Sequence, residues 1–394
     1  MIRVLVMVLL ILATSVRSHA DSHMPPRHLV FEAGTGGYAV YRIPGIVVTK
    51  TGTLLAYCEA RQGGSDWGPI RVVGKRSTDG GKTWSEQQQL SHIDASIARN
   101  PVAVAKKLGK EGEQTWNSPV MIADPDSGVV HLLYGVENCR AFYRRSEDDG
   151  QSWSKPVEIT AALDEFRKEY DWKVFAIGPG HGIKLKSGRL VTSMWLSTST
   201  GANAHHPSSA GTIYSDDNGT TWHAGNIAAA DSAATPHPNE ATMAQLSDGR
   251  VMLNLRTQAQ ENRRLVTISP DGATKWTKPA FDDALNEPIC FASLIRLPGQ
   301  KTLAFSNPNN LEISKGTPKP GQGRDRKNLT IRLSDDDGKT WPHAKVLEAG
   351  PSGYSDLAAA KDGTIYCLFE KGKTGSTGNL YLAAFNTDWV KTKE

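Results

Sequence analysis

Six copies of one short sequence pattern limit this chain to a small number of folds. Each copy is an apolar run, a polar turn that contains glycine, and a second apolar run. The turn glycines are Gly52, Gly128, Gly188, Gly249, Gly299 and Gly363. An interval of roughly 60 residues between copies indicates a repeat architecture. Apolar and β-branched strands around a glycine turn are typical of a β-hairpin, so each copy predicts one hairpin.

A second pattern follows five of the six hairpins and reads Ser-x-Asp-x-Gly-x-Thr-Trp or a close relative. Its copies run from Ser77 to Trp84, Ser146 to Trp153, Ser215 to Trp222 and Ser334 to Trp341, with a degenerate copy from Ser269 to Trp276. An Asp side chain can bond the amides of its own turn, and glycine supplies the positive φ. Calcium binding is the weaker interpretation, because repetition in five units suits a scaffold better than one site. We therefore expect no metal.

A turn of this kind joins two further strands, so each repeat predicts four strands. Six such units without a long helical period indicate an all-β, six-bladed β-propeller with four-stranded antiparallel blades. A two-sheet sandwich built from repeated hairpins is the competing fold. The sixth unit lacks the second pattern, which predicts that a strand near Leu29 to Phe31 completes the last blade. Residues 21–394 would then form one closed domain.

Composition excludes several classes of protein. A hydrophobic fraction of 39% and ten tryptophans can bury a large core, which argues against disorder. The net charge of +4 drops to +2 without Arg3 and Arg17, so the sequence gives no reason to expect a nucleic-acid partner. Polar turns interrupt the chain too often for an integral membrane protein.

The first 20 residues predict a secretory signal peptide. Met1-Ile2-Arg3 is a basic start, Val4 to Ala13 is apolar, and Ser18-His19-Ala20 offers a cleavage site. An uncleaved anchor is the alternative, although the apolar run is shorter than the ~20 residues that span a bilayer. We expect a secreted or periplasmic protein, or one in the lysosome or another organelle if the source is eukaryotic.

The four cysteines do not form a disulfide-scaffold pattern. They are Cys58, Cys139, Cys290 and Cys367, far apart and without a Cys-x-x-Cys spacing. Most of them lie in apolar, strand-like runs. We expect core thiols, with one disulfide at most.

Three arginines stand in otherwise apolar strand contexts of three different repeats. They are Arg42 in Tyr-Arg-Ile-Pro, Arg256 in Asn-Leu-Arg, and Arg332 before the fifth-blade turn. A guanidinium group grips a carboxylate with two parallel hydrogen bonds, and several such groups can surround one anion. The three arginines therefore predict convergence on a single acidic ligand.

Two further segments differ from repeat to repeat, as functional residues would. A glycine-rich loop after the first hairpin carries Asp66, and Pro351-Ser352-Gly353-Tyr354-Ser355-Asp356 precedes the last hairpin. Glu240 occupies the corresponding entrance of the fourth unit. Because blade entrances meet at a propeller axis, we expect Tyr354 and Glu240 to be hydrogen-bonded there.

Taken in order, these motifs resemble the exo-α-sialidases (neuraminidases). The resemblance runs from about residue 28 to residue 385. It rests on the Tyr-Arg-Ile-Pro start, the Glu-Ala-Arg…Ser-Asp-Trp-Gly loop, the Gly-Pro-Gly-His-Gly stretch at 178–182, the Asp boxes and the Pro-Ser-Gly-Tyr-Ser-Asp segment. It implies a six-bladed propeller that hydrolyses terminal α-linked sialic acids of glycoproteins, glycolipids or oligosaccharides without a cofactor.

The resemblance also implies roles for individual residues. Arg42, Arg256 and Arg332 would clamp the sialic acid carboxylate. Tyr354 would be the nucleophile, Glu240 the group that polarises it, and Asp66 the acid/base. Arg61 would lie near the sugar 4-position, Asn117 would contact substrate and Met194 would line the N-acyl pocket. Ser118-Pro119 departs from the usual Asn-Pro of the family.

Two alternatives stay open. A trans-sialidase would need an aromatic acceptor platform, for which Trp67 and Trp172 are the candidates. A non-catalytic sialic-acid-binding propeller would keep the arginines and the boxes but would tolerate loss of Tyr354 and Asp66. Both residues are present, which favours an enzyme.

Overall fold

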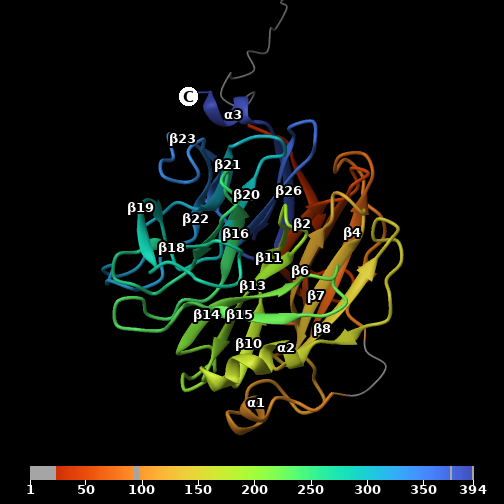
Figure 1. Ribbon diagram of the computed structural model, residues 1–394, viewed down its shortest axis with the longest axis vertical. Helices are drawn as coiled ribbons and strands as arrows, with labels where there is room; N and C mark the ends of the chain where they lie inside the picture. Colours follow the sequence, from red (N-terminus) through yellow and green to blue (C-terminus); the bar gives the residue numbers. More distant parts are fainter. Residues whose placement is uncertain (1–23, 93–96, 373–374, 393–394) are drawn as a thin grey trace, which may run out of the picture.

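Six antiparallel sheets surround one axis, as the six sequence repeats predict (Figure 1). The computed structural model describes residues 24–92, 97–372 and 375–392. The predicted signal peptide, residues 1–20, lies outside these ranges. Each sheet is one propeller blade, and the hairpin of each repeat supplies two of its neighbouring strands. The six-bladed β-propeller prediction is confirmed.

In the first three blades, the four main strands follow one another in chain order from the axis outward. Blade one contains β2 (Val40–Val48), β3 (Leu54–Arg61), β4 (Ile70–Ser77) and β5 (Gln88–Gln89). Blade two contains β6 (Trp116–Ala123), β7 (Val130–Val136), β8 (Arg140–Ser146) and β9 (Val157–Glu158), with β11 (Gly180–His181) parallel to β6. Blade three contains β10 (Val174–Ile177), β13 (Leu190–Ser197), β14 (Ser208–Ser215) and β15 (His223–Ala229), and β12 (Ile183–Lys184) also pairs with β13.

The remaining blades follow the same order, except that the outermost strand of blade six comes from the N-terminus. Blade four contains β16 (Ala241–Gln245), β17 (Val251–Leu255), β18 (Arg263–Ser269) and β19 (Ala280–Asn286). Blade five contains β20 (Ser293–Arg296), β21 (Leu303–Pro308), β22 (Lys327–Ser334) and β23 (His343–Pro351). Blade six contains β24 (Ser355–Ala359), β25 (Ile365–Lys371), β26 (Asn379–Phe385) and β1 (Arg27–Phe31). Helices α1 (Pro101–Ala105), α2 (Thr160–Asp164) and α3 (Thr387–Lys391) lie at the periphery (Figure 1).

The N-terminal strand closes the ring. β1 pairs antiparallel with β26 and supplies the outermost strand of blade six. Val30 and Phe31 are buried in this pairing. The prediction that a strand near Leu29 to Phe31 completes the last blade is confirmed. Closure in this way leaves no blade with a missing strand.

The Asp boxes are turns between the third and fourth strands of blades one to five. In blade three, Ser215 Oγ donates to Asp217 Oδ1 at 2.8 Å and accepts from Gly219 N at 2.9 Å. The Asp217 carboxylate also accepts from Thr221 N at 2.8 Å and from Thr221 Oγ1 at 2.6 Å. Gly219 has φ of 83°, a conformation that glycine adopts without strain. These contacts show the scaffold role that the repetition predicts.

Packing between blades forms the hydrophobic core. One cluster joins blades two and three through residues such as Leu133, Phe175 and Leu196, all fully buried. Cys58, Cys290 and Cys367 are buried, Cys139 is partly exposed, and all four are free thiols, as expected for core cysteines. Within the described residues, no helix is both long and apolar enough to cross a membrane.

Candidate active site

A pocket of about 220 Å³ opens on the axis at one end of the propeller. All six blades contribute residues to its lining, from Arg42 in blade one to Tyr354 at the entrance of blade six. The third strand of a blade leaves this end and runs to its Asp box, so the boxes lie at the opposite end. Functional side chains and scaffold turns are therefore separated by the length of a strand.

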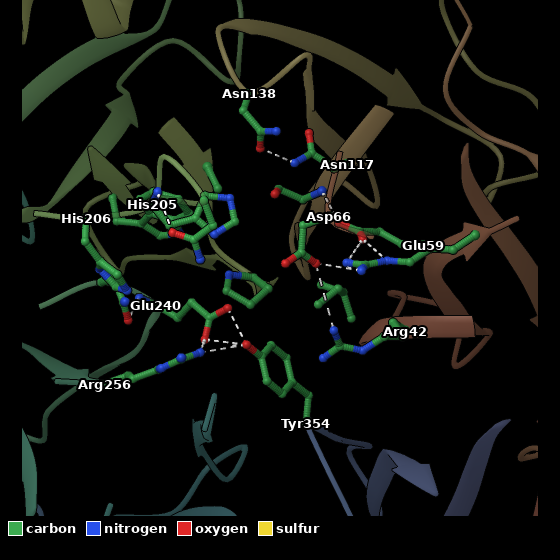
Figure 2. A pocket seen from close by; sticks show the side chains of 18 of the residues that line it. Arg42, Glu59, Asp66, Asn117, Asn138, His205, His206, Glu240, Arg256 and Tyr354 are labelled. Carbon is green, nitrogen blue, oxygen red and sulfur yellow. Dashed lines mark hydrogen bonds and ion pairs between the residues drawn. The ribbon is translucent and has the colours of Figure 1, made fainter. Parts of the chain in front are cut away.

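Tyr354, Glu240 and Arg256 form a hydrogen-bonded triangle in this pocket (Figure 2). The Tyr354 hydroxyl lies 2.6 Å and 2.8 Å from the two carboxylate oxygens of Glu240. Arg256 Nη1 donates to Glu240 Oε2 at 2.6 Å and to Tyr354 Oη at 2.8 Å. Glu240 precedes β16, Arg256 follows β17 and Tyr354 precedes β24, so blade ends place all three. The predicted bond between Tyr354 and Glu240 is confirmed.

The phenol of Tyr354 is held in its neutral form. Burial and the negative charge of Glu240 raise its pKa well above the ordinary value, although Arg256, Arg326 and Arg42 act in the opposite direction. A neutral phenol beside a carboxylate is a proton donor with its acceptor already in place. This arrangement suits a nucleophile that loses its proton during the reaction.

Three guanidinium groups surround Tyr354. The guanidinium carbons of Arg42 and Arg326 each lie 5.2 Å from the centroid of its ring, and Arg256 binds its hydroxyl. Arg326 is fixed by a 2.7 Å bond from Nη2 to the carbonyl of Ile289. Arg256 Nε is buried without a hydrogen-bond partner among the described residues. An unsatisfied buried donor among three cations favours an anionic ligand.

Arg332 is not one of these three, which corrects the sequence prediction. It is the sixth residue of β22, paired in register with Phe305 and Ala344, and its acidic neighbour is Asp282. At about 3.3 Å per residue, it lies roughly 20 Å along the strand from Arg326. Because Arg332 precedes the Asp box by two residues, it belongs to the end opposite the pocket. Arg326, which immediately precedes β22 and lines the pocket, takes the predicted place.

Two buried glutamates that the sequence prediction missed hold the pocket strands. Glu370 of β25 accepts from Arg42 Nε at 3.2 Å, from Ile43 N at 2.9 Å and from Tyr354 N at 3.1 Å. Glu59 of β3 accepts from Ser118 N at 2.7 Å, at the equivalent place in the next blade. Both are acids at the end of an apolar second strand, which is the sequence signal that marks them.

A β-bulge turns Arg42 into the pocket. The pairing of β2 with β3 shifts register between Arg42 and Gly45, and Ile43 has φ of 57°. Gly45 is required because a Cβ there would lie 2.1 Å from the Tyr57 ring. β6 has the same irregularity after Asn117, where Ser118 has φ of 53°. Bulges of this kind re-aim side chains at a sheet end.

Asp66 lies across the pocket from Glu240 and Arg256 (Figure 2). Its side chain is 48% exposed, and Arg61 Nη1 donates to Asp66 Oδ1 at 2.6 Å. Burial would raise the pKa of Asp66, but the charges of Arg61, His205 and Arg42 lower it to about 2. Arg61 is itself buried and bound to Glu59 through Nε at 2.8 Å. The carboxylate at the mouth is thus ionised near neutral pH.

Other predicted residues divide between the pocket and the core. Asn117 lines the pocket and donates to Asn138 Oδ1 at 2.5 Å. Met194 does not line it, which corrects that expectation: its side chain points into the core between blades two and three, and the neighbouring Trp195 lines the pocket instead. Side chains alternate along a strand, so adjacent residues of β13 face opposite ways.

Neither tryptophan proposed for an acceptor platform is exposed. Trp67 is 4% exposed and Trp172 is 1% exposed. Trp67 stacks against His205, with 6.0 Å between ring centroids, and its indole nitrogen donates to the carbonyl of Asn203. Trp172 packs edge-on against Phe175 in the core between blades two and three, and its indole nitrogen donates to the carbonyl of Leu163. Neither ring presents a flat face to solvent.

No metal centre is evident in the part of the chain that the structure describes. There, no three His, Cys, Asp or Glu side chains are grouped so as to hold a metal ion. The positive charge around Tyr354 comes from arginine. The pocket therefore combines an anion-binding cup, a phenol with an acceptor and a separate carboxylate at the mouth.

Comparison with known proteins agrees with this site. A family model described as a BNR repeat-like domain matches residues 98–367, and a model of the BNR/Asp-box repeat matches residues 75–86. A sialidase of Micromonospora viridifaciens is 31% identical over 380 residues, covering 91% of this chain and 53% of that protein. A sialidase of Bacteroides fragilis (strain YCH46) is 32% identical over 374 residues, covering 86% of this chain and 62% of that protein.

A solved structure, Hadza microbial sialidase Hz136, has a TM-score of 0.74 at 27% identity, and the match covers 92% of this chain and 69% of that one. Six blades with Asp-box turns and a pocket on the axis define the class of BNR-repeat propellers. The chain belongs to the sialidase family with BNR repeats. It spans between half and two thirds of the length of the two curated sialidases above.

Proposed function

We propose that this protein is a glycoside hydrolase, an exo-α-sialidase that removes terminal α-linked sialic acids from glycoconjugates or oligosaccharides. The observation that carries the proposal is the Tyr354–Glu240–Arg256 triangle beside Arg42 and Arg326. This site places a nucleophile for the sugar, Tyr354, next to arginines that can bind the carboxylate of the sugar. The relatedness to sialidases of two bacteria supports the same chemistry.

The three arginines would bind the carboxylate of the sugar. Arg42, Arg256 and Arg326 come from blades one, four and five, so they approach one anion from different sides. Arginine forms charge-assisted bidentate bonds, which lysine cannot reproduce. The cup thereby orients the anomeric carbon, which bears that carboxylate, over the Tyr354 hydroxyl.

A phenol suits this substrate better than a second carboxylate. The sialic acid carboxylate is attached to the carbon under attack, so an Asp or Glu nucleophile would approach against like charge. Tyr354 is neutral until it reacts, and Glu240 accepts its proton as the oxygen attacks. Sialidases with a tyrosine nucleophile are a recognised exception to the two-carboxylate rule of glycosidases.

Asp66 would protonate the leaving oxygen from the other side of the pocket. The same carboxylate would then take a proton from the water that hydrolyses the tyrosyl intermediate. Leaving group and water use the same face of the sugar, so the configuration at the anomeric carbon is retained. Observing the first released anomer by NMR tests this step, and inversion would contradict it.

Hydrolysis is favoured over transfer to a second glycan. Trp67 and Trp172, the two residues considered for an acceptor platform, are buried. The presence of Tyr354 and Asp66 in one pocket favours catalysis over simple binding of sialic acid. We also propose that the chain is exported, to the medium, the periplasm or an organelle, on the strength of its N-terminal sequence.

Release of a fluorophore from an α-sialoside tests the function. Wild type should turn over, and Tyr354→Phe should lose about 10²-fold or more in kcat because the nucleophilic oxygen is gone. Tyr366→Phe is the matched control, since Tyr366 is a buried tyrosine of blade six near the Asp-box end. Equal rates for wild type and Tyr354→Phe would overturn the mechanism, and an inactive wild type would overturn the function.

A further inference from the structure

The Gly-Pro-Gly-His-Gly segment at 178–182 separates two cavities on the axis. Pro179 lines the active-site pocket, whereas His181 lines a second cavity of about 300 Å³. Every blade also lines this second cavity, including Ile46 of blade one and Leu357 of blade six. The segment therefore lies directly between the catalytic pocket and the other mouth of the propeller. None of the catalytic steps proposed above uses it.

Glycine at position 180 permits this placement. A Cβ on Gly180 would lie 2.7 Å from Phe291 Cζ and 3.1 Å from Asp356 Oδ1. The carbonyl of Gly180 accepts from the Tyr57 hydroxyl at 2.8 Å, and that hydroxyl accepts from Met121 N at 2.9 Å. The segment is thus fixed from both sides and in contact with the ring that packs against Tyr354.

Asp356 accepts hydrogen bonds from three other blades beneath the pocket. It is fully buried and accepts from Ile46 N at 2.9 Å, from Ser293 Oγ at 2.8 Å and from His181 Nδ1 at 2.8 Å. Ile46 belongs to blade one, His181 to the sheet of blade two, Ser293 to blade five and Asp356 to blade six. A buried carboxylate with this many donors is a rigid junction.

Tyr354 stands two residues before this junction. Side chains alternate along a strand, so the side chains of residues 354 and 356 project to the same side of the chain, one into the pocket and one below it. The Tyr354 ring also packs against Phe291 with 5.6 Å between centroids. The position of the phenol is therefore coupled to Asp356 through the backbone and to Gly180 through Phe291.

We infer that the His181–Asp356 pair is a positioning device for Tyr354, holding the start of β24 so that the hydroxyl meets Glu240 and Arg256. The inference rests on the proposed function for its kinetic readout. Burial lowers the pKa of His181, but Asp356 outweighs burial and raises it. The raised pKa favours the charged form of the imidazole, and a hydrogen bond between charged partners is stronger than a neutral one.

Paired substitutions at His181 test the inference. His181→Ala removes the donor to Asp356, whereas His181→Asn retains an N–H close to the place of Nδ1. A displacement of the nucleophile lowers kcat more than substrate binding, because the arginine cup is left in place. We expect His181→Ala and Asp356→Asn to lower kcat at least about tenfold with KM changed less than about threefold, and His181→Asn to recover most of the rate.

His131→Ala is the matched control for His181→Ala. His131 is also fully buried and bonded through Nδ1, to the Tyr143 hydroxyl at 2.8 Å, but in blade two away from the pocket. Its substitution should lower the melting temperature and leave kcat unchanged. If His181→Ala also lowers the melting temperature and leaves kcat unchanged, the His181–Asp356 pair only stabilises the fold and the inference is wrong. A matching loss of affinity for free sialic acid, measured by calorimetry, would also contradict it, since the whole cup would then have moved.

Failure of the proposed function has a different signature. Absence of α-sialoside turnover by wild type would refute the proposed function. The positioning role of the His181–Asp356 pair would then be tested by structure determination alone. Crystal structures of wild type and His181→Ala would then compare the distance between Tyr354 Oη and Glu240. An unchanged distance of 2.6–2.8 Å in the variant would refute the positioning role on its own.

Discussion

The carboxylate of Asp66 lies 2.6 Å from the guanidinium of Arg61, and that guanidinium is held in turn by buried Glu59. The proposed acid of the reaction is therefore paired with a cation that opposes its protonation. This conflict has consequences for both the leaving group and the pH dependence of the reaction.

Asp66→Asn should discriminate between substrates by their leaving groups. A sugar alkoxide is a poor leaving group and needs a proton from Asp66. An activated phenolate is a good leaving group and depends less on that proton. We expect a loss of about 10²–10⁴-fold in kcat/KM on sialyl-lactose and a much smaller loss on an aryl α-sialoside. Steady-state kinetics on the two substrates measures the difference, and equal losses would remove Asp66 from the acid role.

Arg61 should set the pH at which activity declines. The acid form of Asp66 is needed, so kcat/KM falls as pH rises above the pKa of Asp66, which is about 2. Arg61→Gln removes a positive neighbour, raises that pKa and moves the start of the decline to higher pH. Arg61→Lys keeps the charge and should leave the profile near wild type. Profiles of kcat/KM that superimpose for all three proteins would contradict the assignment.

Arg326, immediately before β22, and Arg332, near the other end of that strand, offer a direct comparison. Arg326→Lys should weaken binding of free sialic acid about 10–100-fold, because a charge-assisted bond contributes about 1.5–3 kcal/mol and lysine cannot fork. Arg332→Lys should leave affinity unchanged, since Arg332 lies at the Asp-box end of β22. Calorimetry with the free sugar decides between them. Loss of affinity in the Arg332 variant alone would restore the original sequence prediction.

An Asp-box carboxylate should affect stability without affecting catalysis. Hydrogen bonds from Thr221 and Ser215 lower the pKa of Asp217 to about 2, from 3.8. A lowered folded-state pKa means that the stabilisation is present above about pH 4 and is lost as pH falls through 2. Asp217→Ala should lower the melting temperature by ~2 °C at neutral pH and keep kcat. The difference in melting temperature between wild type and Asp217→Ala should become smaller at acidic pH. A difference that grows at acidic pH would contradict this explanation.

Chelation should not affect the rate. The proposed steps draw their positive charge from arginine and their proton transfers from Glu240 and Asp66, so no Lewis acid is needed. Activity after treatment with EDTA should equal that of the untreated protein. A loss of activity that calcium or magnesium restores would show that the interpretation of the Asp boxes as pure scaffold is incomplete.

The fold was predictable because its signals are local. A glycine turn between apolar strands and a Ser-Asp-Gly-Thr turn each determine a few residues of backbone, and repetition then counts the blades. The closing strand was predictable by elimination, since the sixth unit lacked a partner. Residues at blade entrances, such as Tyr354 and Glu240, were found for the same reason.

The errors in the site arise where function depends on position along a strand. Arg332 lies in an apolar strand and Arg326 among charged residues, so a search for arginines in apolar strands selects Arg332. The distance to the Asp box, and not the apolar context, decides which of the two reaches the pocket. The prediction for Met194 is wrong by one residue. Side chains alternate along β13, so Trp195 faces the pocket and Met194 faces the core. Glu370 and Glu59 were missed because their hydrogen bonds go to neighbouring blades, which a single repeat does not reveal.

Closure of the ring by β1 has a consequence for the chemistry. Arg42 belongs to the first blade and Tyr354 stands at the entrance of the last. The guanidinium carbon of Arg42 nevertheless lies 5.2 Å from the centroid of the Tyr354 ring, because the pairing of β1 with β26 closes the ring of blades between them. A shortened chain that began after Phe31 would retain every residue proposed for catalysis and still lose the seam that makes those two neighbours. We therefore expect loss of the N-terminal strand to abolish the proposed turnover, although none of the residues proposed for catalysis lies in that strand.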